Sequence, residues 1–498
     1  MMRQSSAPRA CAALLAGLVL MLAAPGRVDA GQCQSSCGQA QPQPGLRIGG
    51  SAEGFAGELV LGLNAGFDTL VLAQPGAFRF ARRVPQGQVY QVRVLRHPTG
   101  LHCTVSAGQG LALGEVADVQ VRCSGGHIAA LPVPQGEAAD AAPLGPLLLD
   151  AGHNLYAIAA RGGQHGHGAV VRIAADGTRT LLHSFATPNA IGAPYRLALS
   201  ADGHYLVGVS EGDGAYEQGT IFRLRRDGSN YQLLHSFGDG GVAVPSSGLL
   251  LASDGSFYGL SASDGSYAGG TLYRWRADEG LQVVHAFANP QDLGGDAPPE
   301  AVEIDALQEL VFPAGELVEG DGVLYGAAMF GGLHRNGGVF GYRLQDARLS
   351  TLASLPPQVP PPQGGLVRGR GGELHGLTSI DSQMRSAWFR VGAGGQLDVS
   401  LLDPAQTAIE RPRGVLLQGS DGRLYGVSAG GGLHGGGTLF SIDPEAGTTQ
   451  VHFSFGGAAR EQLGVAPEHG LLAAANGDLY GSTEFVGPHG HGQLFRID

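Results

Sequence analysis

The stretch GLLAAANGDLYGSTEFVGPHGHGQLFRID, residues 470–498, is the last copy of a repeat that fills most of the chain. A full copy continues past the LFRID-like segment into an apolar run such as LLHSF at 181–185. The last copy stops before that run, whereas an unmatched run, HIAALPV, stands at 127–133, ahead of the first copy. We therefore predict that residues 127–133 complete the last copy and close a ring.

The repeat has a period of about fifty residues, marked by an L-Y-G-like anchor. The anchor residues are Tyr156, Val207, Tyr258, Tyr325, His375, Tyr425 and Tyr480. Each copy holds four strand-like runs, and Asp-Gly pairs between runs supply the positive φ of tight hairpin turns. Four antiparallel strands per copy make a propeller blade, whereas a solenoid would need polar capping copies. The sequence thus predicts an all-β fold with a seven-bladed β-propeller over residues 125–498.

These copies resemble the Gloeo/Verruco repeat of exported bacterial proteins. The resemblance rests on GTIFRL at 219–224, GGTLF at 436–440 and DGRLYGVSAGGG at 421–432. It covers residues 127–498 and is weakest in the fifth copy, around His375. The family implies an exported β-propeller and implies no particular activity.

The chain before the repeats divides into three segments. Residues 1–30 have the charged start, apolar run and small-residue site of a secretory signal peptide, and the apolar run is too short for a membrane span. Residues 31–45 form a polar linker. Residues 46–124 alternate with period two and predict a small β-sandwich, similar to modules that precede repeat domains in exported proteins. We expect a periplasmic or extracellular protein.

Five cysteines are present, and Cys11 lies within the signal peptide. The remaining four allow three pairings, and disulfides are favoured in an exported chain. We favour Cys33–Cys37 and Cys103–Cys123, because the two members of each pair lie within one local segment.

The charge balance restricts the partners. The chain carries 31 basic and 43 acidic residues, a formal net charge of −12. An acidic chain without a basic patch argues against binding nucleic acid or anionic membrane. We expect a monomer whose partner is a polysaccharide, another cell-envelope component or a surface protein.

Two segments, 208–212 and 426–430, match the G-x-S-x-G pattern of a nucleophile elbow. That motif needs a helix directly after the serine, and none is predicted here. Both segments occupy the same repeat position, so we interpret the serines as structural.

Histidines recur in the loop after the second strand of several copies. The first and last copies carry HGHG, which ring closure would make neighbours, and imidazole suits zinc, copper and nickel. The candidate metal ligands are His165, His167, His489 and His491. The candidate rim for ligand binding is His165, Tyr216, Tyr267, His334, His434 and His489. No carboxylate or cysteine completes a metal set in these loops, so we favour a protein without a cofactor.

Two functional hypotheses remain, besides a plain spacer role. The favoured one is a non-enzymatic binding or scaffold module. The alternative is a hydrolase or lyase that uses a metal at the HGHG loops or the carboxylates of an insertion at residues 289–313. An enzyme should bring charged residues from several blades to one point on the axis, so convergence discriminates between them.

Overall fold

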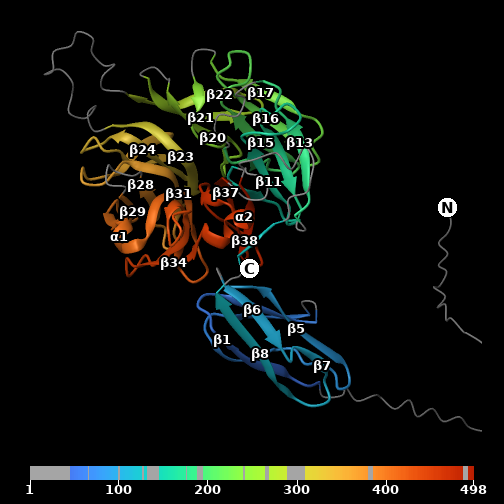
Figure 1. Ribbon diagram of the computed structural model, residues 1–498. Coiled ribbons are helices and arrows are strands. Elements are labelled where there is room, and N and C mark those ends of the chain that lie inside the picture. The colour runs from blue at the N-terminus through green and yellow to red at the C-terminus, as the bar shows by residue number, and fades with distance from the viewer. Residues whose placement is uncertain are drawn as a thin grey trace, which may run out of the picture. The chain divides into compact units, whose positions relative to one another are not determined.

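The computed structural model describes residues 45–64, 67–98, 101–125, 128–131, 145–174, 177–187, 195–238, 242–263, 268–288, 309–378, 385–485 and 492–497. In these ranges nearly all of the regular secondary structure is strand (Figure 1). The predicted signal peptide and nearly all of the predicted linker lie outside them. So do the candidate residues Cys33, Cys37, Tyr267, His489 and His491.

The first structured segment consists of two four-stranded sheets. One has the order β4 (Gly76–Arg79), β1 (Ile48–Glu53), β8 (Val116–Gly125), β6 (Leu101–Ser106). The other has the order β3 (Asp68–Leu72), β2 (Leu59–Leu63), β5 (Val89–Arg96), β7 (Gln109–Leu111). Only the β1–β8 pair is parallel among the pairs in these sheets.

A single apolar core joins the two sheets. It includes Leu61, Phe80 and Val121, which are all at most 1% exposed. The disulfide Cys103–Cys123 borders this core and links directly opposite positions on β6 and β8. It is the pairing favoured from the sequence. A disulfide of this kind typically adds about 2–4 kcal/mol to a small domain.

Seven further sheets follow in the described part of the chain, one per repeat copy. The first three are β10 (Leu148–Leu149), β11 (Leu155–Ala159), β12 (Ala169–Ile173) and β13 (Arg179–Ser184); β14 (Ala198–Leu199), β15 (Tyr205–Ser210), β16 (Thr220–Arg225) and β17 (Gln232–Ser236); and β18 (Ala243–Pro245), β19 (Leu250–Leu251), β20 (Phe257–Ser263), β21 (Ala268–Arg276) and β22 (Gly280–Ala288). The next two are β23 (Leu310–Gly320), β24 (Val323–Gly331), β25 (Gly338–Arg343) and β26 (Arg348–Ser354); and β27 (Pro362–Arg368), β28 (Leu374–Thr378), β29 (Ser386–Val391) and β30 (Leu397–Leu402).

The sixth sheet contains β31 (Ile409–Gln418), β32 (Leu424–Gly431), β33 (Thr438–Ile442) and β34 (Thr449–Ser454). The last contains β35 (Val465–Pro467), β36 (Leu472–Ala473), β37 (Leu479–Phe485), β38 (Leu494–Ile497) and β9 (Ile128–Ala130). Short helical turns, α1 (Pro404–Thr407), η2 (Gly457–Ala459) and α2 (Arg460–Leu463), lie in connections. Figure 1 shows the sheets arranged around a common centre.

The strand before the first copy joins the last copy. Ala130 lies opposite Phe495 and Ile128 lies opposite Ile497, so β9 is the outer strand of the last sheet. The described part of the run HIAALPV, residues 128–131, thus lies beside the last copy, as the unmatched pattern predicted. The apolar cores agree, because one core packs Leu155 of the first sheet against Leu494 of the last. The ring of sheets therefore has no open face between its two ends.

Neighbouring sheets are joined by a repeated aromatic contact. The phenylalanine that ends the LLHSF-type run is buried and meets the aromatic residue of the next copy's third strand. The pairs are Phe185–Phe222, Phe237–Tyr273, Phe287–Phe340 and Phe455–Phe495, with centroids 5.2–5.5 Å apart. Each such aromatic pair adds about 0.5–1.5 kcal/mol beyond its buried area. These contacts explain why both motifs recur.

The Asp-Gly turns also fix the anchor tyrosine. In the sixth copy Gly422 has a φ of 85°, as the turn prediction required. The Asp421 carboxylate accepts the Arg423 backbone N–H at 3.1 Å and the Tyr425 hydroxyl at 2.8 Å. The same Asp–Tyr bond links Asp254 to Tyr258 at 2.9 Å. The motif D-G-x-L-Y-G therefore forms a turn whose aspartate holds the tyrosine of the same motif by a hydrogen bond.

Candidate functional site

The loop histidines lie beside the outer strands of their own sheets. The loop backbone donates to a serine of the outermost strand, as in His165 N to Ser184 Oγ at 3.3 Å and Leu433 N to Ser454 Oγ at 3.2 Å. His165, Tyr216, His334 and His434 have exposed side chains and belong to the first, second, fourth and sixth sheets. The structure does not gather them at one point, and their role in binding stays a prediction.

The metal hypothesis concerns the two HGHG loops. His165 and His167 are described, whereas His489 and His491 lie outside the described residues. Among the residues that are described, no group of three or more His, Cys, Asp or Glu side chains could hold a metal ion. The described half of this candidate site offers two imidazoles, and the metal hypothesis remains a prediction.

The serines of both G-x-S-x-G segments are fully buried strand residues. Ser210 Oγ lies 2.7 Å from Thr220 Oγ1, and Ser428 Oγ lies 2.6 Å from Thr438 Oγ1. Each serine also accepts the backbone N–H of that threonine at 3.1 Å. A hydroxyl committed in this way joins two strands of one sheet and cannot reach a substrate.

One position per copy lies where the first strands of neighbouring sheets approach each other: a Cβ added to Gly248 would lie 2.7 Å from the Arg196 backbone oxygen and 3.1 Å from Glu316 Oε1. In the fourth, fifth and sixth sheets this position lies in a bulge of the first strand, after a glycine of positive φ such as Gly315 at 83° or Gly414 at 69°. Bulges re-aim side chains and often stand next to functional sites. The seven residues at this position are Pro146, Arg196, Gly248, Glu316, Gly365, Val415 and Gly470. Two copies therefore place a charge where the others have an uncharged residue.

At this position the first strands of neighbouring sheets pack backbone to backbone. A Cβ added to Gly414 would lie 2.3 Å from the backbone nitrogen of Gly470 in the next sheet. The cavity between the first, second and last sheets, lined by Arg196 and His469, holds only about 10 Å³. That volume is roughly one water molecule. This cavity therefore has no room for a ligand larger than water.

Arg196, which lines this cavity, forms a charged pair with Glu316. Burial raises the pKa of the Glu316 carboxyl, while Arg196 and the backbone N–H groups of Gly248 and Arg196 oppose that rise. The Arg196 Nε is buried and has no hydrogen-bond partner among the described residues. His469, in the same cavity lining, has its pKa lowered to about 4 by burial.

Tyr195, next to Arg196 in the chain, connects this pair to Glu211, which directly follows strand β15. Its hydroxyl lies 2.6 Å from Glu211 Oε1 and 2.9 Å from the carbonyl oxygen of Pro245 in the next sheet. Burial, followed by the charge of Glu211, raises the pKa of Tyr195, and Glu316 adds to the effect. The tyrosine is thus held as a neutral hydroxyl between the Glu211 carboxylate and the Pro245 carbonyl oxygen, with the charge of Glu316 close enough to raise its pKa further.

Two neighbouring carboxyl groups, those of Glu468 and Glu484, belong to the last copy. Burial and the neighbouring Glu468 raise the pKa of Glu484. Arg161 of the first copy and Arg413 of the sixth oppose this rise, so both cations lie close to the pair. The Arg413 Nε is also buried without a partner in the described part of the chain.

We call these residues together the mouth cluster. Its members are Arg161, Tyr195, Arg196, Glu211, Glu316, Arg413, Glu468, His469 and Glu484. They come from five of the seven sheets and are linked by the contacts above. Perturbed titratable groups gathered in this way are typical of functional sites. Sequence reasoning missed the cluster, although comparing the copies would have shown Arg196 and Glu316 as departures from the repeat.

The insertion at residues 289–313 contributes little to this picture. Residues 289–308 lie outside the described ranges. Glu309, at their edge, has an oxygen 3.3 Å from His285 Nε2, on the outer strand of the third sheet. No helix in the described ranges is both long and apolar enough to cross a membrane.

The sequence pattern of the Gloeobacter/Verrucomicrobia repeat matches residues 94–307, 147–386 and 361–498. These segments cover most of the chain, so the protein belongs to this repeat family. No curated protein matches it in sequence.

Similar solved structures include a gluconolactonase of Xanthomonas campestris, with 18% identity, 61% of this chain and 86% of that chain covered, and a TM-score of 0.37. An oligogalacturonate lyase of Vibrio parahaemolyticus has 10% identity, 83% and 98% coverage, and a TM-score of 0.45. Their activities are properties of those two proteins.

Proposed function

We propose that this protein is an exported binding module, in which a seven-bladed β-propeller follows a small disulfide-linked β-sandwich. The mouth cluster is its binding surface, and the ligand is a polysaccharide of the cell envelope or surroundings. The convergence of charged and polar side chains from five sheets at one end of the ring locates this surface, and its mixture of hydrogen-bond donors and acceptors carries the proposal of binding. An enzyme would bring charged residues together in the same way, so acid–base catalysis is the second candidate. A role as a plain spacer would require no such convergence.

The chemistry of the cluster favours a hydroxylated ligand. Carboxyl groups of raised pKa, a neutral tyrosine hydroxyl and guanidinium groups supply hydrogen-bond donors and acceptors together. The buried Nε groups of Arg196 and Arg413 lack partners among the described residues, and such groups are costly when unpaired. Neither sign of charge dominates, which disfavours a simple polyanion.

The test is a binding screen of the full chain against a panel of purified bacterial and plant polysaccharides. We expect at least one to bind, and Glu316→Gln with Arg196→Gln to weaken binding at least tenfold. Glu445→Gln is the matched control, because the Glu445 side chain is 88% exposed at a turn between outer strands. Binding that the double variant leaves unchanged would remove the mouth cluster from the proposal.

A second candidate function is acid–base catalysis at the last sheet. The raised pKa of Glu484 beside Glu468 is the observation that favours it, because such a pair can hold one proton and one charge. Incubation with the polysaccharides that bind should then release reducing or unsaturated ends. That release should disappear in Glu484→Gln and persist in Glu445→Gln.

A divalent metal at the HGHG loops would be a separate property. A thermal shift with zinc, copper or nickel, lost in His165→Ala with His167→Ala, would establish it. An unchanged melting temperature with all three ions would argue against it.

A further inference from the structure

The second and third sheets enclose a pocket at the end of the ring opposite the mouth cluster. It has a volume of about 440 Å³ and is lined by Val207, Phe257 and Trp275, among others. Strand β15 begins at Tyr205, which lines the pocket, and ends just before Glu211 of the mouth cluster. Six residues of strand separate the two places by roughly 17 Å.

The pocket exists because the second copy lacks the anchor tyrosine. Five copies carry a tyrosine at that position, and in the sixth the Tyr425 hydroxyl reaches its Asp-Gly turn at 2.8 Å. The second copy has Val207 there, whose side chain stops well short of the turn. The third copy faces this position with Phe257 and Trp275. The other copies have leucine in place of Phe257, and a smaller aliphatic residue or tyrosine in place of Trp275. Space remains between Val207 and the rings of Phe257 and Trp275.

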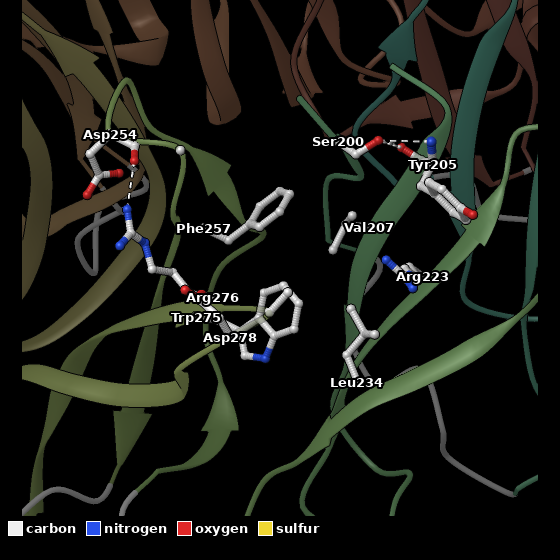
Figure 2. A pocket seen from close by; sticks show the side chains of 12 residues that line it. Ser200, Tyr205, Val207, Arg223, Leu234, Asp254, Phe257, Trp275, Arg276 and Asp278 are labelled. Atoms are coloured by element: carbon white, nitrogen blue, oxygen red, sulfur yellow. Dashed lines mark hydrogen bonds between the residues drawn. The ribbon is translucent and has the colours of Figure 1, made fainter. Parts of the chain in front are cut away.

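The pocket has two apolar walls that face each other. Figure 2 shows Phe257 and Trp275 on one side and Val207, Leu234 and Arg223 on the other. Phe257 and Trp275 are each 8% exposed, so packing holds their rings in place. A wall of rigid aromatic rings opposite aliphatic side chains suits a flat ligand with one apolar face.

Polar groups of both signs stand around these walls. Arg223 donates its Nε to Gln232 at 2.8 Å and lies over the Tyr205 ring at 4.8 Å, which fixes the guanidinium beside the pocket. The exposed Asp278 supplies a carboxylate on the other side. Asp254 is already occupied by its own turn, because it accepts from Ser256 and Tyr258.

We propose that this pocket binds a neutral sugar unit. The apolar face of a sugar ring would lie against Trp275, while its hydroxyl groups would accept from Arg223 and donate to Asp278. Arg276 also lines the pocket but is paired with Glu279. Arg223 and Asp278 therefore remain as one charge of each sign, which disfavours an anionic ligand. Polar groups that can still bond to a ligand disfavour a purely apolar one. The volume falls in the lower half of the range for small-ligand pockets, about 300–1000 Å³, and suits a mono- or disaccharide. This site is separate from the mouth cluster and does not depend on it.

The chain offers its own reporter for this site. It has two tryptophans, and Trp388 is a buried residue of the fifth sheet. In a Trp388→Phe protein, Trp275 is the single source of indole emission. We would titrate this full-length variant with glucose, galactose, mannose, xylose, maltose and cellobiose, and follow the fluorescence.

We expect a saturable change in emission with at least one of these sugars. Adding Val207→Tyr should abolish it, because the restored anchor ring fills the pocket. Adding Arg223→Gln, which leaves the walls intact, should weaken the apparent affinity at least tenfold and covers the case in which Val207→Tyr fails to fold. No saturable change with any sugar, or an unchanged titration in the Arg223→Gln protein, would overturn the proposal.

Discussion

The sixth and second copies of the repeat show how one blade pattern serves two purposes. The sixth keeps every internal bond: Asp421 holds Tyr425, and Ser428 holds Thr438. The second keeps the serine–threonine pair but has Val207 at the anchor and Arg196 at the axis. Regular copies close the ring, whereas the second departs at the two positions that border the mouth cluster and the pocket.

The fifth copy also lacks the anchor tyrosine, but there the space of the missing ring is filled by other side chains. Its His375 is fully buried and stacks on Trp388, with ring centroids 5.8 Å apart. Burial lowers the pKa of His375, so the ring is held neutral. The chain's two tryptophans thus stand beside the two copies without the tyrosine, and one fills the space while the other leaves a pocket.

The largest effect should come from removing the fifth copy's filler. We expect Trp388→Ala to lower the free energy of unfolding by about 3–5 kcal/mol, because it opens a cavity beside buried His375. Urea unfolding followed by circular dichroism measures it. Trp388→Phe is the control and should cost much less. A loss below about 1 kcal/mol for the alanine variant would show that Trp388 is not part of this core.

The next largest effect is a pH dependence of stability that comes from His469 of the mouth cluster. His469 has its pKa lowered to about 4 by burial, against an ordinary 6.5, so the unfolded chain binds its proton first as pH falls. Its contribution is therefore present above pH 6.5 and is lost between pH 6.5 and 4, by about 3 kcal/mol at most. His469→Gln should flatten stability over that window in thermal melts. An unchanged pH profile would mean that His469 is well hydrated.

The regular copies should respond in stability alone. Ser428→Ala leaves the buried Thr438 hydroxyl and backbone N–H without their partner, and we expect a loss of about 1–3 kcal/mol. Polysaccharide or sugar binding should not change. Any hydrolytic activity that this variant abolished, at unchanged stability, would restore Ser428 as a nucleophile and contradict its structural role.

The smallest effect belongs to the anchor hydroxyl. Tyr425→Phe removes the bond from the Tyr425 hydroxyl to Asp421, and we expect a loss of about 1 kcal/mol in the free energy of unfolding. Chemical denaturation at pH 7 resolves a change of that size. Asp421→Asn should cost a similar amount, since it weakens the same bond. A loss of several kcal/mol would mean that the hydroxyl also supports the neighbouring sheet.

Much of the architecture could be predicted from the sequence, because the same strand and turn pattern recurs in every copy of the repeat. The Asp-Gly turns and the unmatched run, of which residues 128–131 are described, each gave a prediction that the backbone geometry and the strand pairing match. The candidate sites follow less well. His165 was a candidate because imidazole binds metals, and the structure places its loop beside the outer strand of its own sheet.

Arg196 and Glu316 were missed for a physical reason. Their proximity depends on the bulge at Glu316 and on the close packing of the second, third and fourth sheets, which bring together residues more than one hundred positions apart in the chain. A sequence pattern shows which residue departs from the repeat but not where its side chain goes. Val207 shows the same limit, because its meaning depends on Trp275 across the sheet interface.

The central claim, that departures from the repeat carry binding, is tested most directly by reverting them. Calorimetric titration of a bound polysaccharide would compare the wild-type chain with Arg196→Gly plus Glu316→Gly, the residue found at this position in three other copies. We predict at least a tenfold loss of affinity at an unchanged melting temperature. Equal affinity in both proteins would contradict the claim and return the search to the loop rim.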